Sequence, residues 1–245
     1  MLFKLISRKY THFIPYKTIK TVNTQAVVSF CFDDFALSAV ANGASILEKY
    51  HCRGTFFTCG NLWGQMENGN LCAGEDEIFV LKNAGHEIGC HTFSHFDCQQ
   101  VSRTDLNADL AKNSKLIRSV TGLDVDSFAF PRGMMDRASQ NVVAKYYATA
   151  RTVLPGINYQ LIDPFALRAY PLYSKYCDLD MFRSVIVHAI DRKAWLIFYT
   201  HDVSDNPSPY GITPEEYEAV VKMVYEKGVT VMPIQQAFRY VVSSK

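Results

Sequence analysis

The sequence predicts an α/β fold in which crossover helices join parallel strands, either as a barrel or as a doubly wound sheet. Short apolar runs alternate with segments of helical periodicity along most of the 245 residues. No linker, internal repeat or low-complexity tract interrupts this alternation. We therefore expect one domain, with a core at about residues 26–240 and an N-terminal extension at residues 1–25.

The first half of the chain contains four expected strands with three helices between them. The strands are the apolar runs at residues 26–32, 54–60, 86–91 and 127–130. The helices occupy residues 38–50, 75–85 and 102–122. Gly85 and Gly122 end two of these helices, because glycine readily adopts the left-handed backbone that closes a helix.

The second half continues the pattern less regularly. A helix at residues 136–146 and a strand at 148–154 precede a section without clear periodicity, residues 156–171, which we expect to be a long loop. The remaining elements are strands at residues 194–201 and 229–234, with a helix at 213–228 between them. That helix begins with a capping box, Thr213 to Glu216, and has Pro214 in its first turn.

Composition limits the class of partner and the compartment. With 25 Lys and Arg against 24 Asp and Glu, the net charge of +1 gives no field that would attract nucleic acid or an acidic membrane. The seven cysteines are odd in number and form no CxxC pair, which favours reduced thiols over a disulfide framework. The basic start lacks the apolar core of a signal peptide, and no stretch is long enough to span a membrane. We expect a cytoplasmic protein.

Ionisable side chains follow four of the expected strands. These are Asp33 and Asp34, then His91 and His95, then Arg132 after Pro131, and finally His201 and Asp202. The carboxyl ends of parallel strands face one mouth, so we expect these side chains to converge there. Each group alone has an ordinary structural explanation, such as a turn cap or a core histidine, but packing does not readily explain all four together.

The spacing of the two histidines indicates a metal site. His91 and His95 with one carboxylate make a set of two imidazoles and one carboxylate, which suits zinc or a related divalent ion with an open position for water. A second carboxylate could accept a proton from that water, and a further histidine could protonate a leaving group. His86, at the other end of its strand, is expected to be structural.

Four short motifs contain the ionisable side chains at the four strand ends and follow one another along the chain in the order SFCFDD, HTFSH, FAFPRG and YTHD. They resemble the motifs of the polysaccharide deacetylase family, carbohydrate esterase family 4, also called the NodB homology domain. The resemblance runs from about Ala26 to near the end of the chain. It implies a distorted (β/α) barrel with seven or eight mostly parallel strands and a metal-dependent hydrolase that removes N-acetyl, sometimes O-acetyl, groups from sugars.

The resemblance also implies roles for individual residues. Asp33 corresponds to the general base and His201 to the general acid. Asp34, His91 and His95 correspond to the ligands of a divalent metal, most readily Zn²⁺, with Mn²⁺, Co²⁺ or Ni²⁺ as alternatives. The backbone N–H of Arg132 corresponds to the donor that stabilises the oxyanion.

The sequence also departs from the family pattern at two positions. Phe35 stands where the family usually has glycine, and we expect it to reshape the wall of the cleft. Ala129 occupies the position of an arginine that orients the base, and Arg132 or Arg168 is expected to replace it.

Two further residues near the acid histidine are candidates for substrate or orienting roles. Asp202 could orient His201, and Tyr210, in the turn-rich segment 202–211, could stack on a sugar ring.

The sequence therefore predicts a cytoplasmic, metal-dependent N-deacetylase of a sugar or glycan precursor. Two alternatives stay open: an amidohydrolase of the same fold that opens ureides or cyclic imides, and a catalytically silent glycan-binding protein. The expected partner is an acetylated sugar or glycan, with no nucleic acid, and the chain is a candidate homo-oligomer.

Overall fold

The strands and helices alternate along the chain as the sequence predicts. The computed structural model describes residues 14–243. Its strands are β1 (Ile19–Lys20), β2 (Val27–Phe32), β3 (Thr55–Thr58), β4 (Met66–Glu67), β5 (Asn70–Leu71), β6 (Glu87–Cys90), β7 (Ser127–Ala129), β8 (Thr149–Arg151), β9 (Leu161–Ile162), β10 (Tyr170–Pro171), β11 (Trp195–Thr200) and β12 (Thr230–Val231). Its helices are η1 (Ala39–Ala44), α2 (Ser45–Lys49), η2 (Gly60–Leu62), α3 (Glu75–Asn83), α4 (Arg103–Thr121), η3 (Pro131–Gly133), α5 (Arg137–Val143), η4 (Ser174–Tyr176), α6 (Leu179–Arg192), α7 (Pro214–Glu226) and α8 (Ile234–Val242).

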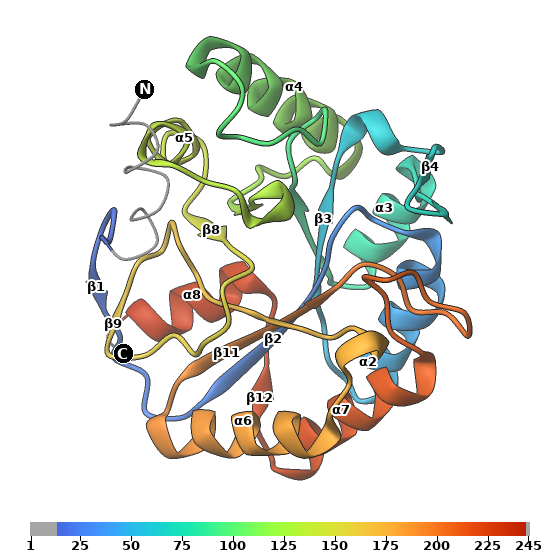
Figure 1. The fold of residues 1–245 in the computed structure, drawn as a ribbon, viewed down its shortest axis with the longest axis vertical. Coiled ribbons are helices and arrows are strands. Elements are labelled where there is room, and N and C mark those ends of the chain that lie inside the picture. Colours follow the sequence, from blue (N-terminus) through green and yellow to red (C-terminus); the bar gives the residue numbers. More distant parts are fainter. Residues whose placement is uncertain (1–13, 244–245) are drawn as a thin grey trace.

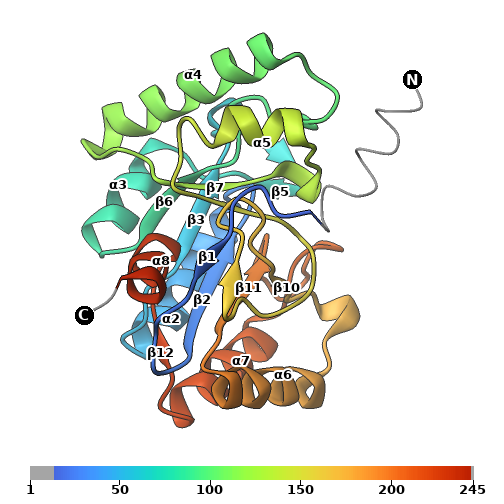
Figure 2. The same cartoon turned by 90° about the vertical axis from the view of Figure 1, so that its left-hand side faces the viewer.

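Eight strands form one curled parallel sheet (Figure 1). The order is β10-β11-β2-β3-β6-β7-β8, and β12 pairs with the first residues of β2 while β3 pairs with its last residues. Every pairing within this sheet is parallel. Helices α4 and α5 lie on one side of the molecule and α6 and α7 on the opposite side (Figure 2). The prediction of a distorted (β/α) barrel with seven or eight mostly parallel strands is confirmed.

Each face of the sheet buries its own core, because successive side chains of a strand point to opposite faces. On β2, Val28, Phe30 and Phe32 pack into the larger core, which the surrounding helices cover. Val27 and Cys31 point to the other face, into a second core that α8 covers with its apolar side chains. This two-sided burial explains why β2 reads in the sequence as a continuous apolar run rather than as alternating apolar and polar residues.

The structure adds elements that the sequence analysis did not identify. Helix α6 begins after its N-cap Asp178, whose carboxylate accepts hydrogen bonds from two backbone amides of the first turn. The expected loop at residues 156–171 contains two short strands, and one of them, β9, pairs with β1. Residues 1–13 of the expected N-terminal extension lie outside the described residues. Within residues 14–243, no helix combines the length and apolarity needed to cross a membrane.

Candidate metal centre and active site

The register of the central strands brings the motif with Asp33 and Asp34 and the motif with His91 and His95 to one edge of the sheet. The amide of Asp33 donates to the carbonyl of Thr200, 2.9 Å away, at the end of the β2 and β11 pair. The amide of His91 donates to the carbonyl of Thr58 over 3.1 Å, at the end of the β3 and β6 pair. These bonds extend the sheet by one residue at the ends of β2 and β6, so the side chains that follow them face one another.

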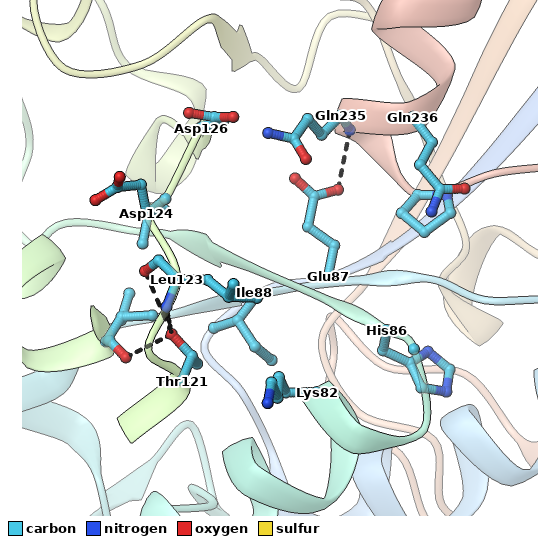
Figure 3. A pocket seen from close by; sticks show the side chains of 14 residues that line it. Lys82, His86, Glu87, Ile88, Thr121, Leu123, Asp124, Asp126, Gln235 and Gln236 are labelled. Atoms are coloured by element: carbon cyan, nitrogen blue, oxygen red, sulfur yellow. Dashed lines mark hydrogen bonds between the residues drawn. The ribbon is translucent and has the colours of Figure 1, made fainter. Parts of the chain in front are cut away.

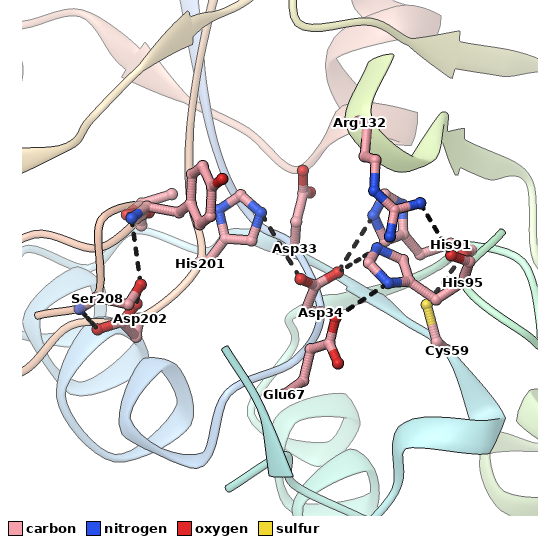
Figure 4. Close-up of polar contacts among 12 residues, drawn as sticks. Asp33, Asp34, Cys59, Glu67, His91, His95, Arg132, His201, Asp202 and Ser208 are labelled. Atoms are coloured by element: carbon pink, nitrogen blue, oxygen red, sulfur yellow. Dashed lines mark hydrogen bonds and ion pairs between the residues drawn. The ribbon is translucent and has the colours of Figure 1, made fainter. Parts of the chain in front are cut away.

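Asp34, His91 and His95 converge on one point (Figure 4). One potential ligand atom from each of them lies within 4.8 Å of the other two. Asp34 Oδ1 is 3.0 Å from His95 Nε2 and 3.4 Å from His91 Nε2. Two ligands bound at 2.0–2.1 Å to a tetrahedral ion lie about 3.3 Å apart, so this spacing fits a divalent metal.

The hydrogen bonding of His91 also fits a metal ligand. Its Nδ1 lies 2.8 Å from the carbonyl oxygen of Ala129, which can only accept, so a proton sits on Nδ1, and in the neutral ring the lone pair lies on Nε2. Asp34 Oδ1 is buried, and no group within residues 14–243 forms a hydrogen bond with it. Lone pairs of an imidazole and a carboxylate that face each other at this distance repel unless a cation lies between them.

Helix α4 fixes the loop that carries both histidines. The buried carboxylate of Asp109 accepts hydrogen bonds from the backbone amides of Phe93 at 2.6 Å and Ser94 at 3.1 Å. Both amides lie between His91 and His95 in the chain. Asp109 therefore closes the loop that sets the separation of the two imidazoles, a role that the sequence analysis did not assign.

Several backbone angles around this edge are strained. Positive φ angles occur at Asp34 (59°), Thr92 (63°), His95 (52°) and Arg132 (57°). Each costs a non-glycine residue about 1–3 kcal/mol. Strain of this kind persists only where surrounding contacts hold it, and its concentration at one site is typical of functional loops.

Asp33 forms an ion pair with a residue that the sequence analysis did not identify. Arg151, on β8, is fully buried, and its Nη2 lies 2.5 and 2.6 Å from the two carboxylate oxygens of Asp33. Burial alone would raise the pKa of Asp33, but the positive charge of Arg151, with contributions from His91 and His201, lowers it below its usual value. Asp33 is therefore ionised at neutral pH.

The pKa of Asp34 moves in the same direction. Burial would raise the pKa of this carboxyl, whereas the imidazoles of His91 and His95 next to it and the charge of His201 lower it well below its usual range. The carboxylates of Asp33 and Asp34 are thus both held in the negatively charged form, which attracts a cation.

His201 lies on the other side of Asp34 from His91 and His95 (Figure 4). Its Nε2 is 3.8 Å from Asp34 Oδ2, and its ring lies beside those of Tyr173 and Tyr210, with centroids 5.8 and 5.4 Å away. Tyr210 is 46 % exposed, so its ring forms part of the accessible wall beside His201. The Nδ1 of His201 is buried and has no hydrogen-bond partner in the described part of the chain.

The expectation that Asp202 orients His201 needs correction. The Asp202 carboxylate is buried and accepts hydrogen bonds from the amide and the hydroxyl of Ser208, at 2.9 and 2.5 Å. Those bonds fix the turn between residues 202 and 211. Asp202 therefore holds the loop after His201, and within residues 14–243 no hydrogen bond joins its carboxylate to the imidazole of His201.

The replacement for the base-orienting arginine also differs from the expectation. Arg168 donates from Nη1 to the carbonyl of Pro155 at 3.0 Å, and the guanidinium of Arg132 donates to the carbonyl of His95 at 3.3 Å. Arg151 instead contacts Asp33. The reason is the sheet order: β8 is next to β7 and Arg151 pairs with Ala129, so an arginine on β8 can reach Asp33.

Phe35 is not part of a cleft wall. Its side chain is fully buried in the larger core, where its ring packs edge-on against Phe56 with centroids 6.3 Å apart. The backbone at Phe35 has a φ of 66°, a conformation that glycine adopts without strain. The substitution of Phe for Gly therefore trades backbone strain for buried apolar surface.

A pocket of about 260 Å³ lies at the opposite ends of the strands, near His86 and Glu87 (Figure 3). His86 accepts from the amide of Gly54 through Nδ1 and contacts Glu48 through Nε2, each at 3.0 Å. Glu87 accepts hydrogen bonds from the hydroxyls of Thr55 and Ser127 and the amide of Gln235. Both groups are engaged in holding elements together, which matches the structural role expected of His86.

The family assignment rests on a match to the first half of the fold. The family model described as "Polysaccharide deacetylase" matches residues 20–150, which is more than half of the chain. The chain belongs to the polysaccharide deacetylase family. The matched segment includes Asp33, Asp34, His91, His95 and Arg132, but not Arg151 or His201.

Curated relatives of the chain include two chitin deacetylases, a bifunctional xylanase/deacetylase and an uncharacterized protein. A chitin deacetylase from Colletotrichum lindemuthianum is 26 % identical over 137 residues, which cover 56 % of this chain and 50 % of that protein. The chain spans half or less of the length of the curated relatives that it matches.

Solved structures of carbohydrate esterase family 4 share the fold. A family 4 acetyl xylan esterase from Clostridium thermocellum, solved in complex with a cobalt ion, has a TM-score of 0.61 at 19 % identity, covering 86 % of this chain and 90 % of that one. A family 4 pseudoenzyme from Bacillus anthracis also has a TM-score of 0.61, at 15 % identity, covering 91 % of this chain and 68 % of that one. At such low identity these likenesses establish the fold and not the activity.

Proposed function

We propose that this chain is a metal-dependent hydrolase that removes N-acetyl groups from a sugar or glycan precursor. The observation that carries the proposal is the convergence of Asp34, His91 and His95, with Asp33 and His201 beside Asp34. Membership of the polysaccharide deacetylase family supports the class of reaction.

Asp34, His91 and His95 would hold the metal. Two imidazoles and one carboxylate suit zinc best among the common divalent ions, with Mn²⁺, Co²⁺ and Ni²⁺ as alternatives. When bound, the ion would polarise the acetyl carbonyl and lower the pKa of a water molecule. The spacing of the three donors and the unpartnered Asp34 Oδ1 support this assignment.

Asp33 would act as the general base. Its carboxylate is ionised and held in one orientation by Arg151, which suits a group that must accept a proton from the attacking water at a fixed position. The same ion pair limits its basicity, since Arg151 stabilises the charged form. Arg151 is therefore a positioning residue for the base.

His201 would act as the general acid. An amine is a poor leaving group unless it is protonated, so the sugar nitrogen needs a proton donor within reach. The position of His201 next to Asp34 and beside Tyr210, which has an accessible ring, supports this role. The backbone N–H of Arg132, in the tight turn after β7, is the proposed donor to the oxyanion.

The environment of the thiols supports a reducing compartment. All seven cysteines are free, and six of them are buried. Burial raises the pKa of several of these thiols, including Cys72 to about 12, so they act as small apolar side chains and not as reactive thiolates. We infer a cytoplasmic location.

A panel of substrates tests the proposed activity. Acetate release is measured from N-acetylglucosamine oligomers and O-acetylated xylan, and ring opening from allantoin and succinimide, with zinc supplied throughout. Release of acetate from the amino sugars, lost in His91→Ala, is the expected result. Opening of the ureide or the imide alone would instead favour the amidohydrolase alternative.

Glycan binding without turnover is a second candidate, because Ala129 departs from the family pattern and only Arg151, from another strand, contacts Asp33 in place of the usual arginine among the described residues. The same panel decides it. Saturable binding of an acetylated oligosaccharide by the zinc-loaded protein, with no turnover of any compound on the panel, would identify a binding protein and reject the hydrolase.

A further inference from the structure

Glu67 lies on a two-stranded hairpin outside the four sequence motifs. Strands β4 and β5 are antiparallel and are joined by Asn68 and Gly69, whose φ angles of 50° and 81° match a two-residue turn of the kind that an Asn-Gly pair favours. Side chains alternate along a strand, so Met66 faces solvent, with 63 % of its surface exposed, while Glu67 points inward.

The hairpin is anchored to the loop that carries Asp34. The amide of Ala73 donates to the carbonyl of Phe35 over 2.8 Å, and Cys72 forms a β-bridge with Ala36. Both contacts use the backbone. The position of Glu67 is therefore set by main-chain bonds that a change of its own side chain leaves in place.

Glu67 reaches the imidazole of His95 on the side away from Asp34. Glu67 Oε1 lies 3.4 Å from His95 Nδ1, and His95 Nε2 lies 3.0 Å from Asp34 Oδ1 (Figure 4). The ring thus lies between two carboxylates. A carboxylate on the Nδ1 side favours the tautomer with the proton on Nδ1, which leaves the Nε2 lone pair free to bind a cation.

The two histidines are supported in different ways. His91 has a neutral hydrogen-bond acceptor, the carbonyl of Ala129, at its Nδ1, whereas His95 has the negatively charged carboxylate of Glu67 3.4 Å from its Nδ1. A charged partner raises the basicity of the imidazole more than a carbonyl does, and it adds attraction for a cation beyond the ring. The affinity of His95 for a cation therefore depends on the side chain of Glu67, which a substitution can remove.

We propose that Glu67 is a positioning residue that holds His95 in its metal-binding tautomer and strengthens retention of the cation. This inference rests on the proposed metal centre. Losing an acceptor of this kind typically weakens metal binding about 10–100-fold. A purely structural role in the hairpin would leave metal affinity unchanged.

Zinc binding to the metal-free chain tests this proposal. Affinity is measured by competition with a chromophoric chelator for wild type, Glu67→Gln, Glu67→Ala and the control Glu75→Gln. Glu75 is an exposed residue at the start of α3, so its substitution removes the same charge without touching the site. We expect the order wild type and Glu75→Gln, then Glu67→Gln, then Glu67→Ala, with Glu67→Ala weaker by about 10–100-fold.

The intermediate variant and a second readout separate tautomer from charge. In Glu67→Gln the side-chain amide oxygen can still accept from Nδ1–H but carries no charge, and ¹⁵N shifts of the His95 ring in the metal-free protein report its tautomer directly. Equal zinc affinity for Glu67→Ala and wild type would overturn this inference alone. Failure of the wild-type protein to bind zinc would overturn the metal centre and this inference together.

Discussion

The guanidinium of Arg151 is completely buried against the carboxylate of Asp33, with its Nη2 within 2.6 Å of both oxygens. The rings of Tyr199 and Phe57 flank the guanidinium, with centroids 4.6 and 5.4 Å from its central carbon. The charge pair and the aromatic contacts fix the orientation of Asp33, the proposed base. The arginine comes from β8, whereas the family usually supplies it from the strand that corresponds to β7. Arg151 therefore contributes both to the stability of the fold and to the orientation of Asp33.

Replacing Arg151 by Met should destabilise the protein strongly. The change leaves Asp33 buried without its charge partner, and breaking a buried pair in this way typically costs about 3–5 kcal/mol in the free energy of unfolding. Urea denaturation of the metal-free protein measures it. The control is Arg118→Met, which breaks an exposed pair with Asp124 and should leave the free energy of unfolding nearly unchanged. Similar losses in the two variants would contradict a special role for the buried pair.

Replacing Asp109 by Ala should loosen the loop between the two histidines. The amides of Phe93 and Ser94 lose their acceptor, which should destabilise the fold by about 2 kcal/mol and weaken zinc binding. Hydrogen exchange of these two amides is the direct measurement, and both should exchange faster. Asn107→Ala, at an exposed position on the same helix, is the matched control. Unchanged protection in Asp109→Ala would show that the loop holds its shape without this carboxylate.

Stability should fall as the pH drops through the titration range of His86. Burial lowers the pKa of His86 in the folded protein, and Arg53 adds to the shift while Glu48 opposes it. The unfolded chain therefore binds a proton, near pH 6.5, that the folded protein resists. The stability contributed by this group is present above that pH and is lost below it, with a slope of at most about 1.4 kcal/mol per pH unit.

His86→Gln removes this titration. Urea denaturation at several pH values from 7.5 to 5 should show a steeper loss of stability in the wild type than in the variant, although the variant starts from a lower stability because its amide replaces a ring packed edge-on against Phe56. Parallel curves for the two proteins would mean that other groups cause the acid sensitivity.

The sequence predicted the site best where chemistry follows directly from strand ends. Asp33, Asp34, His91 and His201 each lie at or directly after the end of an expected strand, and the carboxyl ends of parallel strands must lie together. The pairing of Asp33 with Arg151 was harder to foresee, because it joins β2 to β8 across the interior of the sheet. One signal was present: an arginine within the apolar run at residues 148–154 needs a charged partner if that run is buried.

Other differences arise from local geometry that a motif does not encode. Phe35 turns into the core because the backbone there is left-handed, which directs the ring away from the mouth. The hairpin that carries Glu67 could have been recognised from its Asn68-Gly69 turn, but its contact with His95 depends on how the hairpin folds back onto the Asp34 loop. Sequence spacing alone does not determine such a contact.

Zinc content measured together with acetate release, for wild type and Asp33→Asn, tests the central claim most directly. Asp33 is not a proposed ligand, so we expect both proteins to bind one zinc ion per chain, while only the wild type releases acetate from N-acetylglucosamine oligomers. Acetate release by Asp33→Asn at the wild-type rate, or a wild-type chain that binds no zinc, would contradict the assignment.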